Sequence, residues 1–210
     1  MPRIGPFEKY TSRYDYWFEE NRPVYESELE ALRANMPPYA KGIEIGVGSG
    51  RFAVPLGISF GVDPSPMMMN VARRRGVQAV YGVAEKLPFA DSSFDLALMV
   101  TTICFLDDAR SAFMEVNRIL KNSGYFVIGF IDKNSLVGRV YQEKRTQSVF
   151  YKLATFYSVE EIVSLLEYSG FDNVSFTQTI FKSMKDIEKP EPVIPGHGKG
   201  SFVVVRALKR

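Results

Sequence analysis

The 210-residue sequence contains only one cysteine and one histidine. Cys104 has no partner for an internal disulfide, which fits a reducing compartment and predicts a cytoplasmic protein. No group of histidines, cysteines and carboxylates has the spacing of metal ligands, so we predict a metal-free site. Cys104 could act as a nucleophile, but no neighbouring histidine would activate it, and packing is the simpler role. His197 could act as a base or simply lie on the surface in a loop rich in proline and glycine.

Long apolar runs and a strong net charge are also missing. No window of about 18 apolar residues could form a transmembrane helix, and the N-terminus has no apolar signal core. A net charge of +2 gives little attraction to nucleic acid or to an anionic membrane. The composition, 46% hydrophobic and 24% charged, is typical of one globular domain with a full core. We therefore expect neither a membrane nor a nucleic acid as partner.

What the sequence does contain is a glycine-rich stretch after a short apolar segment. Ile43 and Ile45 are β-branched and favour a buried strand. Gly46, Gly48 and Gly50 follow at once, and glycines allow positive φ and close approach of a ligand to the backbone. The pattern predicts a strand, a turn and a helix start at the ligand-binding edge of an open α/β sheet.

Two acidic residues narrow the choice of nucleotide. Glu44 would repel a pyrophosphate but could accept a hydrogen bond from an ammonium group. Asp63 ends the next predicted strand, where a carboxylate can accept both hydroxyls of a ribose. The glycine spacing is G-x-G-x-G rather than the G-x-G-x-x-G of dinucleotide sites. These residues favour an adenosine with a cationic tail over a dinucleotide.

The sequence resembles the class I S-adenosylmethionine-dependent methyltransferases, especially their small-molecule branch (methyltransferase type 11-like). The resemblance covers residues ~40–208, in the family's order, and it rests on five groups of residues: 44–50 (EIGVGSG), 61–67 (GVDPSPM), 84–89 (AEKLPF) with 93–96 (SFDL), 115–121 (EVNRILK) and 201–205 (SFVVV).

The resemblance implies an α/β fold: a Rossmann-like, seven-stranded, mostly parallel sheet with an antiparallel C-terminal hairpin, in a three-layer α/β/α sandwich. We divide the single domain 1–210 into an N-terminal helical cap (1–40), a cofactor-binding core (41–131), a helical lid (132–157) and a C-terminal helix with a strand hairpin (158–210). The expected cofactor is S-adenosylmethionine, with S-adenosylhomocysteine as product. The cofactor-binding residues implied are Glu44, Gly46, Gly48, Gly50, Asp63, Pro64, Met67, Ala84, Glu85 and Thr101.

The acceptor site should be aromatic. By resemblance, the aromatic N-terminus and the lid would cover the cofactor and contact the acceptor, through Tyr14, Trp17, Phe18, Phe105, Tyr141 and Tyr151. The alternative is that these rings only pack on the domain, since aromatic stripes are usually core. Relatives often carry a pair of histidines where this chain has Cys104 and Phe105, and no catalytic base can be named.

Three functions compete at this stage. The first is methyl transfer to a small molecule by direct displacement, and the second is a non-catalytic cofactor-binding domain that acts through a protein partner. The third, a nicotinamide oxidoreductase, is disfavoured by the glycine spacing and by the predicted terminal hairpin. The acceptor, the methylated element and the oligomeric state are not encoded in any motif that we can read.

Overall fold

The computed structural model describes residues 4–210, and its centre is one eight-stranded sheet with the order β3-β2-β1-β4-β5-β8-β6-β7. The strands are β1 Gly42–Ile45, β2 Phe60–Asp63, β3 Gln78–Tyr81, β4 Phe94–Val100, β5 Leu120–Ile131, β6 Phe171–Thr179, β7 Ile194–Pro195 and β8 Phe202–Lys209. β1 to β5 pair in parallel, whereas β8 is antiparallel to both β5 and β6. The Rossmann-like sheet and its C-terminal hairpin are thus confirmed, but the strand count of seven is one too low.

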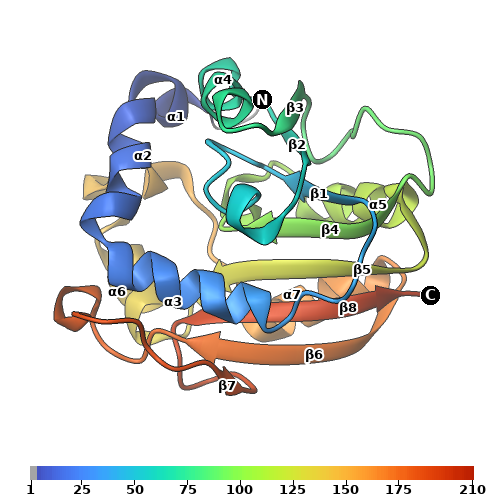
Figure 1. The fold of residues 1–210 in the computed structure, drawn as a ribbon. Helices are drawn as coiled ribbons and strands as arrows, with labels where there is room; N and C mark the ends of the chain where they lie inside the picture. The colour runs from blue at the N-terminus through green and yellow to red at the C-terminus, as the bar shows by residue number, and fades with distance from the viewer. Residues whose placement is uncertain (1–3) are drawn as a thin grey trace.

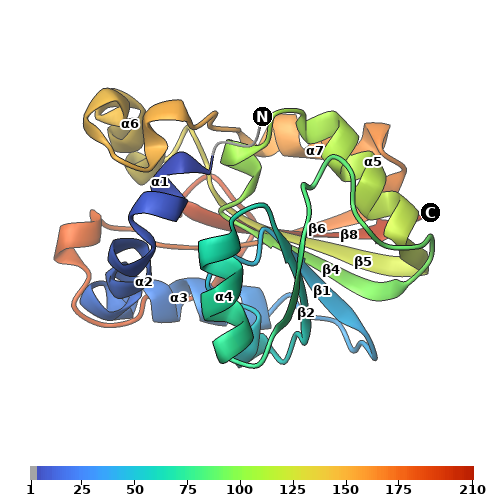
Figure 2. The ribbon, with the colours of Figure 1, turned by 90° about the horizontal axis from the view of Figure 1, so that it is seen from above.

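Seven α-helices surround the sheet in the described part of the chain. They are α1 Gly5–Lys9, α2 Thr11–Glu20, α3 Arg22–Arg33, α4 Pro66–Arg74, α5 Ala109–Ile119, α6 Leu136–Glu143 and α7 Val159–Tyr168. Figure 1 shows α1, α2 and α6 at the end of the sheet where the parallel strands terminate. Viewed from above, α5 and α7 lie on one face of the sheet and α3 and α4 on the other, which makes three layers (Figure 2).

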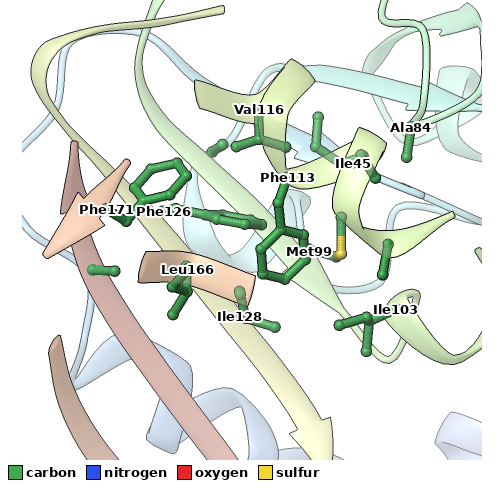
Figure 3. Close-up of a cluster of buried hydrophobic side chains, with 14 of the residues drawn as sticks. Ile45, Ala84, Met99, Ile103, Phe113, Val116, Phe126, Ile128, Leu166 and Phe171 are labelled. Atoms are coloured by element: carbon green, nitrogen blue, oxygen red, sulfur yellow. The ribbon is translucent and has the colours of Figure 1, made fainter. Parts of the chain in front are cut away.

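Each face of the sheet has its own apolar core. β4 is a continuous apolar run, as expected of a parallel strand covered on both faces, and alternate residues enter the two cores. Met99 joins Phe113 of α5 and Leu166 of α7 (Figure 3), whereas Leu98 packs with Leu32 of α3. The strand ends are therefore held rigidly from both sides.

Two local predictions need correction. The sequence Asn122-Ser123-Gly124 predicts the end of a helix with Gly124 in the left-handed region, but α5 already ends at Ile119 and β5 begins at Leu120. Ser123, with φ +59°, takes the left-handed conformation inside that strand. The added strand β7 has only two residues and pairs with Thr177 and Gln178. Its proline-containing sequence reads as a loop, which is why it was missed.

None of the helices formed by residues 4–210 has the length and apolar composition of a membrane-spanning segment.

Candidate active site

The site begins where the parallel strands end, at the point where the strand order reverses between β1 and β4. A pocket at this edge, called here the cofactor pocket, takes its walls from the ends of β1, β2 and β4, from the loop after β3 and from the N-terminal segment. The residues that line it are Ile4, Phe7, Tyr14, Gly46, Gly48, Val62, Asp63, Pro64, Ser65, Met68, Gly82, Val83, Ala84, Glu85, Val100, Thr101, Thr102, Phe105, Leu106 and Asp107.

The glycine loop has the geometry that its sequence predicts. Gly46 has φ +73°, and a Cβ there would lie 2.3 Å from the Thr102 side chain. Gly48, with φ +52°, lies in the pocket wall, and its amide donates a 2.8 Å hydrogen bond to Oδ2 of Asp63. Gly50 is not in the wall: a Cβ there would meet Val77 and Ala72, so this glycine lets the loop pack on α4.

Asp63 is the buried carboxylate at the end of β2. Oδ1 accepts a hydrogen bond from the Ser65 amide, also at 2.8 Å, so backbone donors hold both oxygens in place. Burial raises the pKa of Asp63 to about 6, although the hydrogen bonds from Ser65 and Gly48 act in the opposite direction. Each carboxylate oxygen keeps a second lone pair, so the group can still accept hydroxyl donors from the pocket.

Glu44 lies in β1 and not in the pocket wall, two residues before Gly46. It is 2% exposed, and burial raises its pKa well above the usual range, with the charge of Asp63 adding to the effect. Its Oε2 has no hydrogen-bond partner among residues 4–210. An unpartnered buried carboxylate oxygen is rare in a native protein and points to a donor from outside the chain.

The other predicted cofactor residues divide into two groups. Pro64, Ala84, Glu85 and Thr101 line the cofactor pocket. Met67 does not: it is 49% exposed at the start of α4, and its neighbour Met68, 1% exposed, lines the pocket instead. Ser65 is the N-cap of α4, and its Oγ accepts from the Met68 amide, which turns position 68 and not position 67 inward.

Glu85 has a structural task as well. Its Oε1 accepts hydrogen bonds from the Asp107 and Asp108 amides at 2.9 and 3.2 Å, just before α5 begins. Glu85 therefore ties the loop after β3 to the loop after β4, two adjacent parts of the pocket wall.

Thr101 follows β4 and has φ +49°, which is an outlier for a β-branched residue. Its amide donates a 2.8 Å hydrogen bond to the Gly129 carbonyl of β5, which helps to fix this conformation. Such backbone strain is concentrated at functional sites.

A second pocket, called here the aromatic chamber, adjoins the first. It lies between α2, α3 and the segment 141–151, and nine of its fourteen lining residues are aromatic. The lining residues are Phe7, Arg13, Tyr14, Trp17, Phe18, Glu20, Glu28, Phe52, Thr101, Phe105, Ile131, Tyr141, Phe150 and Tyr151. All six aromatic residues predicted to contact the acceptor are among them.

The two pockets share part of their walls: Phe7, Tyr14, Thr101 and Phe105 line both. Phe7 packs edge-on against Tyr14 and Phe105, with ring centroids 5.4 and 4.9 Å apart. Tyr141 and Tyr151 stack at 4.8 Å, and Tyr151 also stacks on Phe105 at 5.8 Å.

Sequence reasoning missed Glu28, a buried acid in the chamber wall. It also missed Glu8, which accepts hydrogen bonds from the Ser65 hydroxyl and the Met67 amide and so ties α1 to the pocket. The signal for Glu28 was available, because Tyr25, Leu29 and Leu32 have the spacing of an apolar helix face and Glu28 falls on that same face, where an ionisable residue is out of place.

The cofactor pocket fits the sulfonium cofactor that the resemblance implies. Asp63 can take ribose hydroxyls, the loop 82–85 and Met68 offer a wall for the adenine, and the unpartnered Oε2 of Glu44 suits an ammonium group. Nearby carboxylates favour a ligand of positive charge. These assignments are predictions that follow from the geometry.

The comparisons with known proteins agree with this fit. A family model described as a methyltransferase domain matches residues 43–128. An uncharacterized protein of Methanocaldococcus jannaschii is 43% identical over 206 residues, which cover 98% of this chain and all of that protein.

Solved structures extend the match. A Thermotoga maritima S-adenosylmethionine-dependent methyltransferase is 47% identical, with a TM-score of 0.96 over 99% of this chain and 100% of that one. A Haemonchus contortus N-methyltransferase in complex with S-adenosylhomocysteine superposes with a TM-score of 0.62 over 88% of this chain and 52% of that one; at 17% identity it shows the fold alone. With a matching family model and a near-identical fold at 47% identity, the chain belongs to the S-adenosylmethionine-dependent methyltransferases.

Proposed function

We propose that the chain is an enzyme that transfers a methyl group to a small-molecule acceptor by direct displacement, without a metal ion. The observation that supports this proposal is the wall that the cofactor pocket and the aromatic chamber share. Because Tyr14, Thr101 and Phe105 line both, a cofactor in one pocket and an acceptor in the other would meet there. Among residues 4–210, no three histidine, cysteine or acidic side chains gather in a way that could hold a metal ion.

Bound S-adenosylmethionine supplies a methyl group on a positively charged sulfur, so that the acceptor's lone pair forms the new bond to carbon while the carbon–sulfur electron pair stays on sulfur. The task of the chain is to hold two molecules in line and to keep water out. Asp63 holds the ribose and Glu44 the ammonium group, directly or through water. The aromatic walls fix the orientation of a flat acceptor.

Two features favour a small acceptor. The chamber is lined on α2 by Tyr14 and Trp17 and on the lid by Phe150 and Tyr151, so the N-terminal cap and the lid enclose it. The Thermotoga maritima relative is described as a possible histamine N-methyltransferase, and histamine is a small amine. An enclosed aromatic chamber suits a molecule of this size better than a protein or a nucleic acid.

The proposal is tested by incubating the protein with S-adenosylmethionine and a panel of small amines, phenols and carboxylic acids while S-adenosylhomocysteine release is measured. Steady release with one acceptor class is expected. Cofactor binding without release to any acceptor, natural extracts included, would favour the non-catalytic alternative in which the domain acts through a protein partner.

A methyl group made chiral with hydrogen isotopes tests the displacement itself. A single displacement inverts the methyl carbon, whereas a methyl-enzyme intermediate on Cys104 would return it with retention. Inversion is expected, because the Cys104 thiol donates a 3.3 Å hydrogen bond to the Thr101 carbonyl and lies outside both pocket walls.

A further inference from the structure

The aromatic chamber contains one acidic side chain that neither the fold nor cofactor binding explains. Glu28 of α3 is 4% exposed and lines the chamber, but not the cofactor pocket. No residue of the described chain, 4–210, donates a hydrogen bond to its carboxyl group or forms an ion pair with it, and burial is the single influence on its pKa. A buried carboxyl group without a partner destabilises a protein. Its presence in the wall of a cavity therefore indicates that a ligand in the cavity supplies the partner.

Among residues 4–210, no basic side chain acts on the pKa of Glu28, which is shifted by burial alone. The titratable side chains that face it across the chamber are Tyr14 of α2 and Tyr141 and Tyr151 of the lid. Burial raises the pKa of each tyrosine, and the Glu28 charge adds to this effect. Arg13 and Glu20, the other charged lining residues, are exposed on α2. Since no described residue pairs with an ionised Glu28, a cation inside the chamber could supply the counter-charge.

A chamber with aromatic walls around a carboxylate is suited to one chemical class of ligand, the organic cations. Tyrosine, tryptophan and phenylalanine faces attract an organic cation, and a buried carboxylate pairs with its N–H donors. A neutral or anionic acceptor would leave Glu28 unpaired in an apolar space.

We propose that the aromatic chamber binds the methyl acceptor as a basic amine and that Glu28 is the residue that pairs with its nitrogen. This inference rests on the proposed function, because it assigns the acceptor class of the same site. Glu28 would also take the proton that the ammonium group must lose before its lone pair is free: the N–H bond breaks, the electron pair stays on nitrogen, and the proton forms the O–H bond of the carboxyl. After the product leaves, Glu28 keeps this proton and releases it to water when the next ammonium group binds and forms the ion pair.

The acid strength of Glu28 suits this exchange. Burial raises the pKa of Glu28 to about 8, nearer to the value of about 10 that is usual for an alkylammonium group, so proton transfer from the ammonium group to Glu28 costs less than transfer to an ordinary carboxylate. In the free protein near pH 7 the carboxyl group is therefore protonated. Formation of the ion pair would release up to one proton to the buffer for each amine bound.

The test uses the full-length protein saturated with S-adenosylhomocysteine, titrated calorimetrically with three amines, 2-phenylethylamine, tryptamine and histamine. The neutral analogue 2-phenylethanol serves as the comparison ligand. Glu28→Gln is the test variant, and Glu30→Gln on the same helix, where Glu30 is exposed and paired with Arg33, is the matched control.

We expect at least one amine to bind about tenfold or more tightly than the alcohol, with proton release detected from the buffer dependence of the binding heat. Glu28→Gln should weaken amine binding by about 30-fold or more and abolish the proton release, because it leaves the ammonium without a counter-charge. Binding of the alcohol and of S-adenosylhomocysteine should stay unchanged, as should amine binding by Glu30→Gln. Glu28→Asp should recover part of the lost affinity.

Equal binding of amine and alcohol, or full amine affinity in Glu28→Gln, would overturn the inference. So would a failure of all three amines to bind while S-adenosylhomocysteine binds normally. A protein that does not bind S-adenosylhomocysteine at all would instead refute the proposed function, so the two failures are distinguishable. Retained S-adenosylhomocysteine affinity in Glu28→Gln shows that the variant is folded.

Discussion

Three buried acids define the site at the level of single residues. Glu28, Glu44 and Asp63 are at most 8% exposed, and burial raises the pKa of each. A buried carboxyl group with a raised pKa lowers the free energy of unfolding at neutral pH. Such groups are therefore found mainly at functional sites. Each of the three faces a different expected partner: an amine acceptor, an ammonium group and a ribose.

Asp63→Ala should weaken S-adenosylhomocysteine binding by tenfold to a hundredfold. Hydrogen bonds to a charged group are worth about 1.5–3 kcal/mol, and the substitution also frees the Gly48 amide that Asp63 holds. Calorimetry measures the change, with the exposed Asp91→Ala as control. Unchanged affinity in Asp63→Ala would remove this residue from the site.

The same residue predicts how cofactor affinity depends on pH. Hydroxyl donors require the ionised carboxylate, and the pKa of Asp63 is about 6. Affinity should therefore be constant above about pH 7 and fall by up to about tenfold per pH unit below pH 6. Titrations between pH 5 and 8 test this, and an affinity independent of pH in that interval would contradict it.

Glu28 makes a prediction for stability. Its folded-state pKa of about 8 lies above that of an unfolded glutamate, so between about pH 4.3 and 8 the folded chain binds more protons than the unfolded chain. The contribution of this group to stability is therefore fully present below that window and is lost as the pH rises through it, by an amount on the order of 5 kcal/mol.

Denaturant titrations of the wild type and Glu28→Gln over this pH range measure the effect. The variant should be less sensitive to pH and more stable than the wild type at pH 8. Parallel pH profiles for the two proteins would show that Glu28 does not titrate as described.

At the scale of elements, the N-terminal cap is tied to the cofactor-binding core by one carboxylate. Asp15 of α2 accepts hydrogen bonds from Arg51, just after the glycine loop, and from Arg75, at the end of α4, at 2.7–3.0 Å. Arg75 also donates to the Ser49 carbonyl. α2 therefore cannot move away from the site without breaking this cluster.

Asp15→Asn should loosen α2 and lower the free energy of unfolding by about 2 kcal/mol, because two partly buried arginines lose their charged partner. Hydrogen exchange should become faster in residues 5–20 and remain slow in β4 and β5. Glu19→Gln is the matched control: Glu19 pairs with the same Arg51, but it is 52% exposed and its loss should change stability by about 0.5 kcal/mol or less. Equal effects of the two variants would contradict this role of Asp15.

The start of α7 carries a capping box that the sequence predicts. The Ser158 hydroxyl accepts from the Glu161 amide, and the Glu161 carboxylate accepts from the Ser158 amide at 2.7 Å. Ser158→Ala should therefore destabilise the protein by about 1 kcal/mol in urea unfolding. Ser164→Ala, at an exposed position of the same helix, should be neutral or slightly stabilising; a larger loss there than at Ser158 would be inconsistent with the capping role.

The elements could be predicted wherever local patterns determine them. The strand that contains Ile43 and Ile45 and the strand that ends at Asp63 were both predicted from the sequence, and Ser65 followed by Pro66 is typical of a helix start such as that of α4. β7 could not be predicted, because a two-residue strand exists only through its partner β6. Met67 and Met68 could not be distinguished either, since the inward direction depends on where the first turn of α4 begins.

At the scale of the whole molecule, the order of the motifs along the chain predicts where the site lies. The glycine loop follows β1, Asp63 ends β2, and a further loop follows β3. Because the carboxyl ends of parallel strands lie at one edge of the sheet, the topology brings these three segments together. The aromatic chamber depends on tertiary packing of α2, α3 and the lid, which no short motif encodes. Its rings were predicted by resemblance, whereas Glu28 required the structure.

The most direct test of the whole account is calorimetric titration of the protein with S-adenosylmethionine, S-adenosylhomocysteine and NAD, with Asp63→Ala in parallel. We predict that the first two bind, that NAD does not, and that the variant loses most of the affinity. Saturation at a hundred times Kd should also add about 2.7 kcal/mol to the free energy of unfolding. Binding of NAD alone, or of none of the three, would contradict the account.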